Sequence, residues 1–337
     1  MFCALSDVKG DLSMGILVGI DEAGYGPLLG PLTVSAAAIR MSDEQIRGDH
    51  WGILKKAISK EKRSLKGRLL IADSKKAYNR KAGPVHLRRT VLAVLKCLEN
   101  AYPEVPVTAR ELANVLCAQC APRLDGYEWY KGLDTQKLRS DCGDIGIAAN
   151  VLRTSLREND MQILTLKSRC LDVGYYNKMV ENVKNKSRVL FTSIAGLIQE
   201  SLDLANEGEE LQIVVDRQGG RARYGDLLRR MFGGMELSVI REDEIDSSYE
   251  LRGVGKTMRI HFVVKADAKC MPVCLASMTS KYLREVMIES LNDYFVAQCD
   301  KIKPTAGYWQ DGLRFVEEVK AHLPGVEYDE QKLVRSR

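Results

Sequence analysis

Apolar runs that end in carboxylates recur along the chain. Each run is short and partly β-branched, as in strands buried inside a sheet. The predicted strands cover residues 15–20, 211–216 and 258–264. The acidic residues at or just beyond their ends are Asp21, Glu22, Asp216 and Asp267. The pattern therefore predicts a sheet with acidic side chains gathered where strands end.

A turn rich in glycine and proline connects residues 15–20 to another apolar run, residues 32–39. A strand, a tight turn and a second strand predict an antiparallel pair. Gly24, Gly26 and Gly30 resemble a dinucleotide-binding fingerprint, but their spacing is off by one residue. That fingerprint must also open a helix, whereas a strand-like run follows here. The turn therefore does not predict a dinucleotide site.

Apolar residues that repeat every four positions predict a long helix after Pro272. The repeating residues are Leu283, Met287, Leu291 and Phe295, and together they make one apolar stripe. Proline suits the first turn of such a helix. Further helices are predicted over residues 112–120 and 310–319.

The composition is that of a folded protein. Of the 337 residues, 45% are hydrophobic and 28% are charged, which suffices for a full core and excludes a mainly disordered chain. No apolar run approaches the roughly 20 residues that a membrane span needs. Residues 1–15 lack the basic start and apolar run of a secretory signal. We therefore expect a cytoplasmic protein.

Positive charge is concentrated in one segment. Residues 51–90 contain 13 Lys and Arg against only Glu61 and Asp73, a local net charge of +11. Because the whole chain carries +5, the other 297 residues carry a net −6. A local basic surface is expected of a protein that contacts phosphates, although a solvated charged face gives the same pattern.

Nine cysteines are scattered along the chain, an odd number that does not suit a secreted disulfide framework. Cys117 and Cys120 form the one CxxC motif, and Cys142 is a candidate third zinc ligand. A structural zinc site needs four ligands, and neither a second CxxC nor a suitable histidine supplies the fourth. We therefore favour thiols packed among helices over a zinc site.

Clustered carboxylates without nearby histidine suit hard cations such as Mg²⁺ or Mn²⁺. Two such ions can activate a water and stabilise the leaving oxygen of a phosphodiester. Any one of the acidic residues could instead be an ordinary turn former at a strand end. That alternative is harder to hold for three segments of a chain that also carries a basic segment.

At these residues the sequence resembles type 2 ribonucleases H (ribonuclease HII), whose opening motif is DEAGRGPLAGP. The corresponding segment here is Asp21-Glu-Ala-Gly-Tyr-Gly-Pro-Leu-Leu-Gly-Pro31. Asp73-Ser-Lys-Lys76 matches the DSKK of that family, and Val215-Asp216 resembles the segment of its third carboxylate. Lys265-Ala-Asp-Ala-Lys269 and the following residues to Met278 resemble KADAKYPVVSAASI, and Thr305-Ala-Gly-Tyr308 resembles a late GYP segment. Five matches in the same order are more specific than any one of them.

The resemblance implies a ribonuclease H-like α/β fold, with a mixed five-stranded sheet flanked by helices and a helical C-terminal part. Residues 175–202 resemble the central helices of the family and are therefore predicted as helical. It implies a monomeric endonuclease that hydrolyses the RNA strand of RNA/DNA hybrids or cuts at ribonucleotides in duplex DNA, using two Mg²⁺ or Mn²⁺ ions. The implied catalytic and metal-binding residues are Asp21, Glu22, Asp216 and Asp267. The implied substrate-binding residues are Gly24, Tyr25, Gly26, Ser74, Lys75, Lys76, Lys265, Ser277 and Tyr308.

The chain departs from the family at several positions. Tyr25 stands where the family usually has Arg or Lys, which removes a phosphate-facing cation. The distance of 143 residues from Asp73 to Asp216 exceeds that usual in the family, which predicts a helical insertion. Tyr127, Trp129 and Tyr130 in this insertion are expected to form its core, with base stacking as the alternative. The predicted units are a discontinuous core (14–100 and 161–300), the insertion (101–160) and a C-terminal helical segment (301–337).

Two other functions remain open from the sequence. A nucleic-acid binding protein on the same fold with weak or lost catalysis is motivated by Tyr25 and by the altered helix start Cys274-Leu-Ala-Ser-Met278. A related nuclease that acts on DNA structures is the other, because a fold alone does not fix the substrate.

Overall fold

A computed structural model describes most of the chain. The described residues are 14–78, 82–98, 104–138, 140–253, 255–326 and 328–336. The opening segment 1–13 and the predicted boundary between residues 100 and 101 lie outside these ranges.

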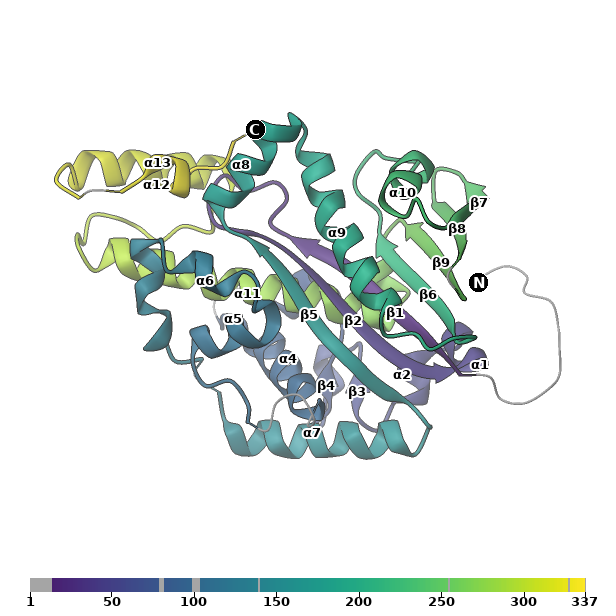
Figure 1. Ribbon diagram of the computed structural model, residues 1–337. Helices are drawn as coiled ribbons and strands as arrows, with labels where there is room; N and C mark the ends of the chain where they lie inside the picture. The colour runs from purple at the N-terminus through teal and green to yellow at the C-terminus, as the bar shows by residue number, and fades with distance from the viewer. Residues whose placement is uncertain are drawn as a thin grey trace.

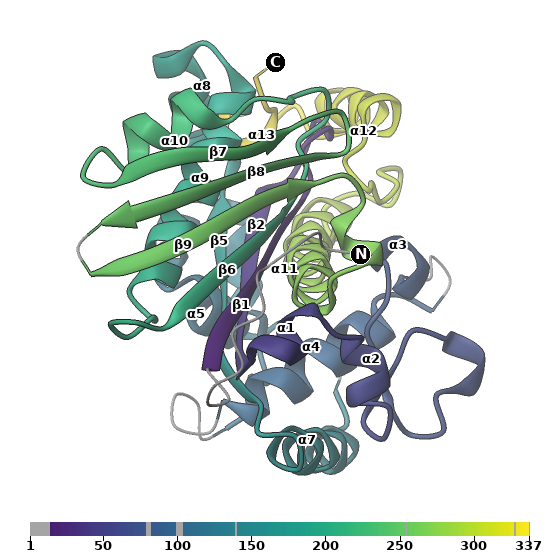
Figure 2. The ribbon, with the colours of Figure 1, turned by 90° about the vertical axis from the view of Figure 1, so that its right-hand side faces the viewer.

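A mixed sheet of seven strands forms the centre of the molecule, in the order β5-β2-β1-β6-β9-β8-β7 (Figures 1 and 2). The strands are β1 (Met14–Ala23), β2 (Leu32–Ser42), β5 (Gln162–Leu171), β6 (Glu210–Asp216), β7 (Glu236–Glu242), β8 (Asp246–Gly253) and β9 (Lys256–Val263). β6 runs parallel to β1 and to β9, and the other neighbours are antiparallel. A separate parallel pair joins β3 (Ile58–Ser59) to β4 (Leu69–Leu70).

The antiparallel pair predicted on either side of the glycine-rich turn is confirmed as β1 and β2. The predicted number of five strands is wrong. Five strands, β5-β2-β1-β6-β9, form a mixed sheet of the expected kind, but β8 and β7 extend it beyond β9. β7 is an edge strand that is exposed along almost its whole length, although it contains Leu237, Val239 and Ile240.

Helices cover both faces of this sheet. They are α1 (Asp43–Arg47), α2 (His50–Ile53), α3 (Ser74–Ala77), α4 (Val85–Cys97), α5 (Ala109–Cys117), α6 (Ala121–Leu124), α7 (Cys142–Arg157), α8 (Val173–Val183), α9 (Lys186–Leu202), α10 (Gly225–Met231), α11 (Met271–Val296), α12 (Trp309–His322) and α13 (Glu330–Leu333). Short 3₁₀ segments are η1 (Lys62–Ser64), η2 (Glu128–Asp134) and η3 (Ala266–Ala268). None of the helices in the described ranges is long and apolar enough to cross a membrane.

The four predicted helices are present. The helix after Pro272 is α11, and its predicted apolar stripe is buried. The segment predicted as helical over residues 175–202 is two helices, because Lys184 adopts a left-handed conformation (φ 49°) between α8 and α9. Helices α5 and α12 correspond to the other two predictions, with ends shifted by a few residues.

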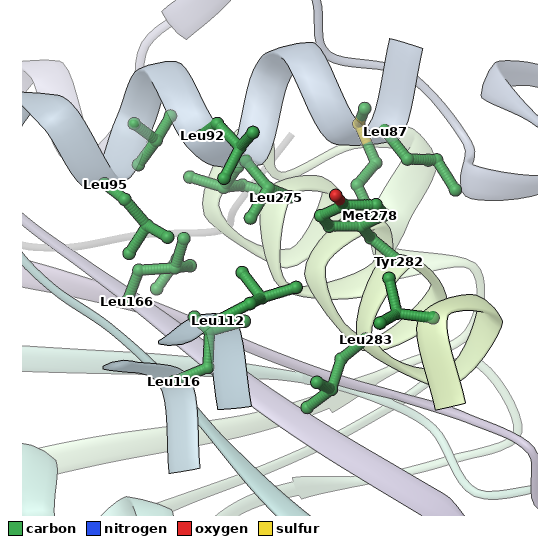
Figure 3. Close-up of a cluster of buried hydrophobic side chains, with 14 of the residues drawn as sticks. Leu87, Leu92, Leu95, Leu112, Leu116, Leu166, Leu275, Met278, Tyr282 and Leu283 are labelled. Atoms are coloured by element: carbon green, nitrogen blue, oxygen red, sulfur yellow. The ribbon is translucent and has the colours of Figure 1, made fainter. Parts of the chain in front are cut away.

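Each face of the sheet has its own hydrophobic cluster. α4, α5, α7 and α11 pack on one face, whereas α8, α9 and α10 cover the other (Figure 2). Figure 3 shows leucines of α4 and α5 against Leu166 of β5 and against Leu275, Met278, Tyr282 and Leu283 of α11. The segment 104–160 therefore shares a core with the sheet and with α11, and its treatment as a separate unit stays a prediction.

The aromatic group of this segment lies in that core. Tyr127, Trp129 and Tyr130 are each at most 4% exposed, and Trp129 stacks 5.7 Å from Phe295 of α11. The expectation that these rings form a core is confirmed, and burial removes them from contact with nucleic-acid bases.

Gly19 determines how closely α11 approaches the sheet. A Cβ atom at this position would lie 2.0 Å from the backbone nitrogen of Val273 and 2.1 Å from the backbone carbonyl carbon of Pro272. Real Cβ atoms do not approach backbone that closely, so only glycine allows this packing. The first turn of α11 is therefore pressed against the middle of β1, close to the acidic end of the strand.

Candidate active site

Strand register brings Asp21 and Asp216 together. Ile20 of β1 pairs with Val215 of the parallel strand β6, so the next residue of each strand is acidic. Side chains alternate between the faces of a strand. Leu17 and Val214 lie in the cluster on the α11 face, and Asp21 and Asp216 stand an even number of residues after them on the same strands. Both carboxylates therefore point to the α11 side at the carboxyl ends of adjacent strands.

Asp267 joins them from the segment that follows β9, the next strand in the sheet. β9 lies beside β6 and ends at Val263, after which the chain turns sharply into η3. Lys265 makes this turn with a left-handed backbone (φ 54°), which few residues other than glycine adopt. The backbone N–H of Ala266 then donates to Oδ1 of Asp216 at 2.7 Å, which fixes η3 against the end of β6.

Glu22 lies on the opposite face of β1. It stands two residues after Ile20, whose side chain belongs to the cluster under α9, so the two side chains point to the same face. It is nevertheless part of the same electrostatic group, because Asp216 raises its pKa. The four predicted carboxylates are thus neighbours at one sheet edge, with three aspartates on the α11 side and Glu22 on the α9 side.

Burial raises the pKa of all four carboxyl groups, and neighbouring acidic side chains raise it further, which for Asp267 means Asp73. Burial is the largest cause in each case. The pKa of Asp21 is raised well above its usual value, next by Glu22 and then by Asp216. Burial and the charge of Asp216 raise the pKa of Glu22 to about 7, and burial followed by the charge of Asp267 raises that of Asp216 to about 6. Such a cluster is costly unless cations offset its charge.

Lysines of the basic segment supply part of that positive charge. Lys75 lowers the pKa of Asp216 and of Asp267, and Lys76 lowers that of Asp267. Neither lysine forms an ion pair within 4.0 Å, and none of the four carboxylates takes part in one in the described part of the chain. The repulsion is therefore only partly compensated by the protein.

The chemistry of this donor set fits a hard divalent cation. All four proposed donor groups are carboxylates, whose oxygens Mg²⁺ and Mn²⁺ prefer. Among the described residues, however, no three His, Cys, Asp or Glu side chains already form a metal cage. The carboxylates would have to turn toward a common point to bind an ion.

Two serines link the DSKK segment to the carboxylates. Asp73 caps α3 by accepting from the backbone N–H of Lys75 at 2.8 Å. Ser277 on α11 donates to Ser74 Oγ at 3.1 Å, and its hydroxyl also lowers the pKa of Asp21. The predicted residues Ser74, Lys75, Lys76 and Ser277 are therefore placed beside the carboxylates, whereas Lys265 is exposed at the turn before η3.

The glycine-rich turn and the late aromatic residue form a second, connected group. Gly24 has a left-handed backbone (φ 88°), and Gly26 is exposed, with no atom within 4 Å of the position that a Cβ would take. The carbonyl of Gly307 accepts from the backbone N–H groups of Leu28 (2.8 Å) and Leu29 (3.1 Å). Tyr308 follows at the start of α12 and is 54% exposed. Backbone hydrogen bonds therefore tie the turn to the segment that carries Tyr308.

Two buried arginines that sequence reasoning missed brace this group. Arg284 of α11 is 1% exposed and donates to the carbonyls of Leu29 (3.2 Å) and Ala306 (3.0 Å). Arg335 is 4% exposed and donates from Nη1 to the carbonyl of Gly24. A charged residue beside the apolar stripe of α11 is a signal that could have marked Arg284. No local pattern marks Arg335.

The three cysteines weighed as zinc ligands lie on α5 and α7, outside the segments that carry the carboxylates, whereas the charges of Asp267 and Asp21 reach the buried Cys274 of α11 and, after burial, raise its pKa. Cys117 and Cys120 are buried at the end of α5, and Cys120 Sγ accepts from the backbone N–H of Cys170 at 3.2 Å. Cys142 is exposed at the start of α7. The structure places the three thiols weighed for zinc in two different environments.

Comparison with known proteins gives one relative in sequence. No protein-family model matches the chain. Ribonuclease HII of Aquifex aeolicus (strain VF5) is 28% identical over 147 residues, which are 43% of this chain and 70% of that protein. This relative supports a ribonuclease H type 2-like family for the chain, in agreement with its motifs.

Solved structures of the same kind are similar over most of the chain. A ribonuclease HII from Archaeoglobus fulgidus, solved in complex with PCNA, has a TM-score of 0.43 at 17% identity and covers 96% of this chain and 94% of its own. Bst ribonuclease HIII in complex with Mn²⁺ has a TM-score of 0.42 at 14% identity, and the match covers 96% of this chain and 67% of the Bst chain. These TM-scores lie below 0.5, so the sequence relative and not the structural likeness supports the family. The fold itself is an α/β fold with a mixed sheet flanked by helices.

Proposed function

We propose that this chain is a metal-dependent ribonuclease H-type endonuclease. The observation that carries the proposal is the meeting of Asp21, Asp216 and Asp267 at three neighbouring strand ends, with Glu22 in electrostatic contact. No cationic side chain neutralises this group through an ion pair in the described ranges. The similarity to ribonuclease HII supports the same class of reaction.

Asp21, Glu22, Asp216 and Asp267 would hold two Mg²⁺ or Mn²⁺ ions. When bound, such ions activate a water and stabilise the leaving oxygen of a phosphodiester. Lys75 and Lys76, exposed beside the carboxylates, would bind the phosphates that flank the cleaved bond. Ser74 and Ser277 would hold Asp21 in place, and Lys265 would contact the substrate backbone at the turn before η3.

The substrate would be an RNA/DNA hybrid or a DNA duplex with embedded ribonucleotides. A 2′-hydroxyl in a shallow minor groove distinguishes RNA from DNA. The backbone of Gly24, Tyr25 and Gly26 is accessible to such a groove because Gly26 carries no side chain and is exposed. Tyr308 has enough exposed ring to stack on a sugar or base.

End-labelled duplexes with no, one or several ribonucleotides test this function, with Mg²⁺, Mn²⁺ or EDTA. Cleavage only at ribonucleotides is expected, with loss of at least 100-fold in rate for Asp216→Asn. The exposed Asp300 provides a matched control, since Asp300→Asn removes a carboxylate outside the cluster. Binding of hybrid without cleavage under every metal condition would support the binding-protein alternative. Equal cleavage of the all-DNA duplex would support a nuclease acting on DNA structures.

A further inference from the structure

A second basic surface lies on the α9 side of the sheet, apart from the basic segment 51–90. Two short stretches, residues 184–188 and 217–223, contain six Lys and Arg and no acidic residue. The first stretch connects α8 to α9, and the second follows Asp216 at the end of β6. Figure 1 shows both in the upper part of the molecule. We call them together the α9 basic surface.

A side-chain hydrogen bond joins the two stretches. Arg221 donates from Nη2 to Oγ of Ser187 at 2.7 Å, which fixes the guanidinium beside the start of α9. The neighbouring Lys186 places its ammonium 5.2 Å from the centre of the Tyr25 ring. Residues from three separate segments, at positions 25, 186–187 and 221, thus meet at one place.

This place adjoins the carboxylate cluster. Burial is the main cause that raises the pKa of Tyr25, and the charge of Glu22 adds to it whereas Arg221 and Arg335 oppose it. Tyr25 therefore lies within electrostatic reach of both Glu22 and Arg221. Because Glu22 points to the α9 side of β1, the α9 basic surface borders the site on the side opposite Lys75.

Most cations of this surface form no ion pair with the described residues. Lys184, Lys186, Arg188 and Arg221 form no ion pair in the described ranges. By contrast, Arg217 is held by the carbonyls of Arg221 and Asp243, and Arg223 lies 3.8 Å from Glu242. Exposed like charges that are brought together repel each other, and a bound anion relieves that repulsion.

We propose that Lys186 and Arg221, together with the Ser187 hydroxyl and the Tyr25 side chain, bind one backbone phosphate of the nucleic-acid substrate. The site rests on the proposed function and extends it by a contact on the α9 side. It also gives a role to Tyr25, because the positive charge beside this side chain comes from Lys186 and Arg221. The ligand is a phosphodiester of a duplex rather than an acidic protein, because the site borders the carboxylates proposed to cut that duplex.

The test is binding in EDTA, where cleavage cannot occur. Fluorescence anisotropy would measure the Kd of a duplex with one ribonucleotide at several salt concentrations. The Lys186→Ala/Arg221→Ala variant should bind at least tenfold more weakly at low salt, and the slope of log K against log salt should fall by about one. Lys186→Arg should keep the affinity. Lys137→Ala/Arg157→Ala, which removes two exposed cations elsewhere, should bind like wild type.

A methylphosphonate scan identifies the phosphate. When one phosphate at a time is replaced by a neutral methylphosphonate, wild-type protein should bind more weakly to the duplex altered at one particular position. The double variant should bind that altered duplex as well as it binds the unaltered one. Unchanged affinity and salt slope in the double variant, with an unchanged melting temperature, would overturn the site, as would wild-type protein that binds no duplex. Wild-type protein that binds with this salt dependence but never cuts would instead overturn the proposed function and leave the phosphate site supported.

Discussion

Neutralising Asp216 should stabilise the metal-free protein. Burial and the charge of Asp267 raise the pKa of Asp216 from 3.8 to about 6. A shift of about two units corresponds to roughly 3 kcal/mol at 1.36 kcal/mol per unit. The pKa is raised on folding, so the folded state holds the proton more tightly and stability falls as pH rises from 3.8 to about 6. Above that window the folded protein bears the full cost of the ionised group.

We therefore expect Asp216→Asn to raise the free energy of unfolding by about 1–3 kcal/mol at pH 8 in EDTA. The amide Oδ1 can still accept the 2.7 Å hydrogen bond from Ala266, so little else is lost. Removing this charge also relieves Asp21 and Glu22, whose pKa values it raises. At the lower end of this window, near pH 4, the difference should be smallest, and wild type and variant should unfold at similar urea concentrations.

Urea denaturation followed by circular dichroism measures the difference, with Asp300→Asn as the control. Adding Mg²⁺ at pH 8 should stabilise wild type more than the variant, because a ligand that binds only the folded state shifts the equilibrium. A variant that is less stable than wild type at pH 8, or a difference that is the same at pH 4 and pH 8, would refute the electrostatic account of the cluster.

Three further predictions concern the rest of the fold. Gly19→Ala should lower the free energy of unfolding by roughly 3 kcal/mol or more, because the new Cβ would lie 2.0 Å from the Val273 backbone. In the same urea assay, Gly146→Ala on α7 should be neutral or stabilising by up to about 1 kcal/mol, because the Cβ would enter open space. Tyr127→Phe should cost about 1–3 kcal/mol, since its hydroxyl donates to the buried Asp172 and accepts from the Gly174 N–H at 2.9 Å; an unchanged thermal midpoint would contradict this. At pH 7, iodoacetamide should modify the exposed Cys142 before Cys120, because Cys120 is only 6% exposed. This order is expected although a hydrogen bond from Cys117 lowers the pKa of Cys120 to about 6 and so favours its reactive thiolate. Peptide mass spectrometry over time measures the order, and earlier modification of Cys120 would contradict the role of accessibility.

Local patterns were sufficient to locate the strands that carry the carboxylates. An apolar run followed by an acidic residue is visible in one dimension, because burial in the sheet selects the run and the acidic residue marks its end. The same holds for α11, whose apolar stripe follows from helical periodicity. β7 was not predicted, although its Val239 and Ile240 are residues that favour strands. It is an exposed edge strand, and its pairing with β8 appears only in the tertiary structure.

The sequence by itself determined which chemistry was available: four carboxylates at strand ends, a basic segment beside a DSKK motif, and a glycine-rich turn. Only the tertiary structure decided which faces these groups use, because strand register sends Asp21 and Asp216 to the α11 side and Glu22 to the α9 side. It also brought Arg335 to Gly24 across 311 positions and Arg221 to Ser187 across 34. Contacts of that range depend on how the whole chain packs, so no local pattern of residues contains them.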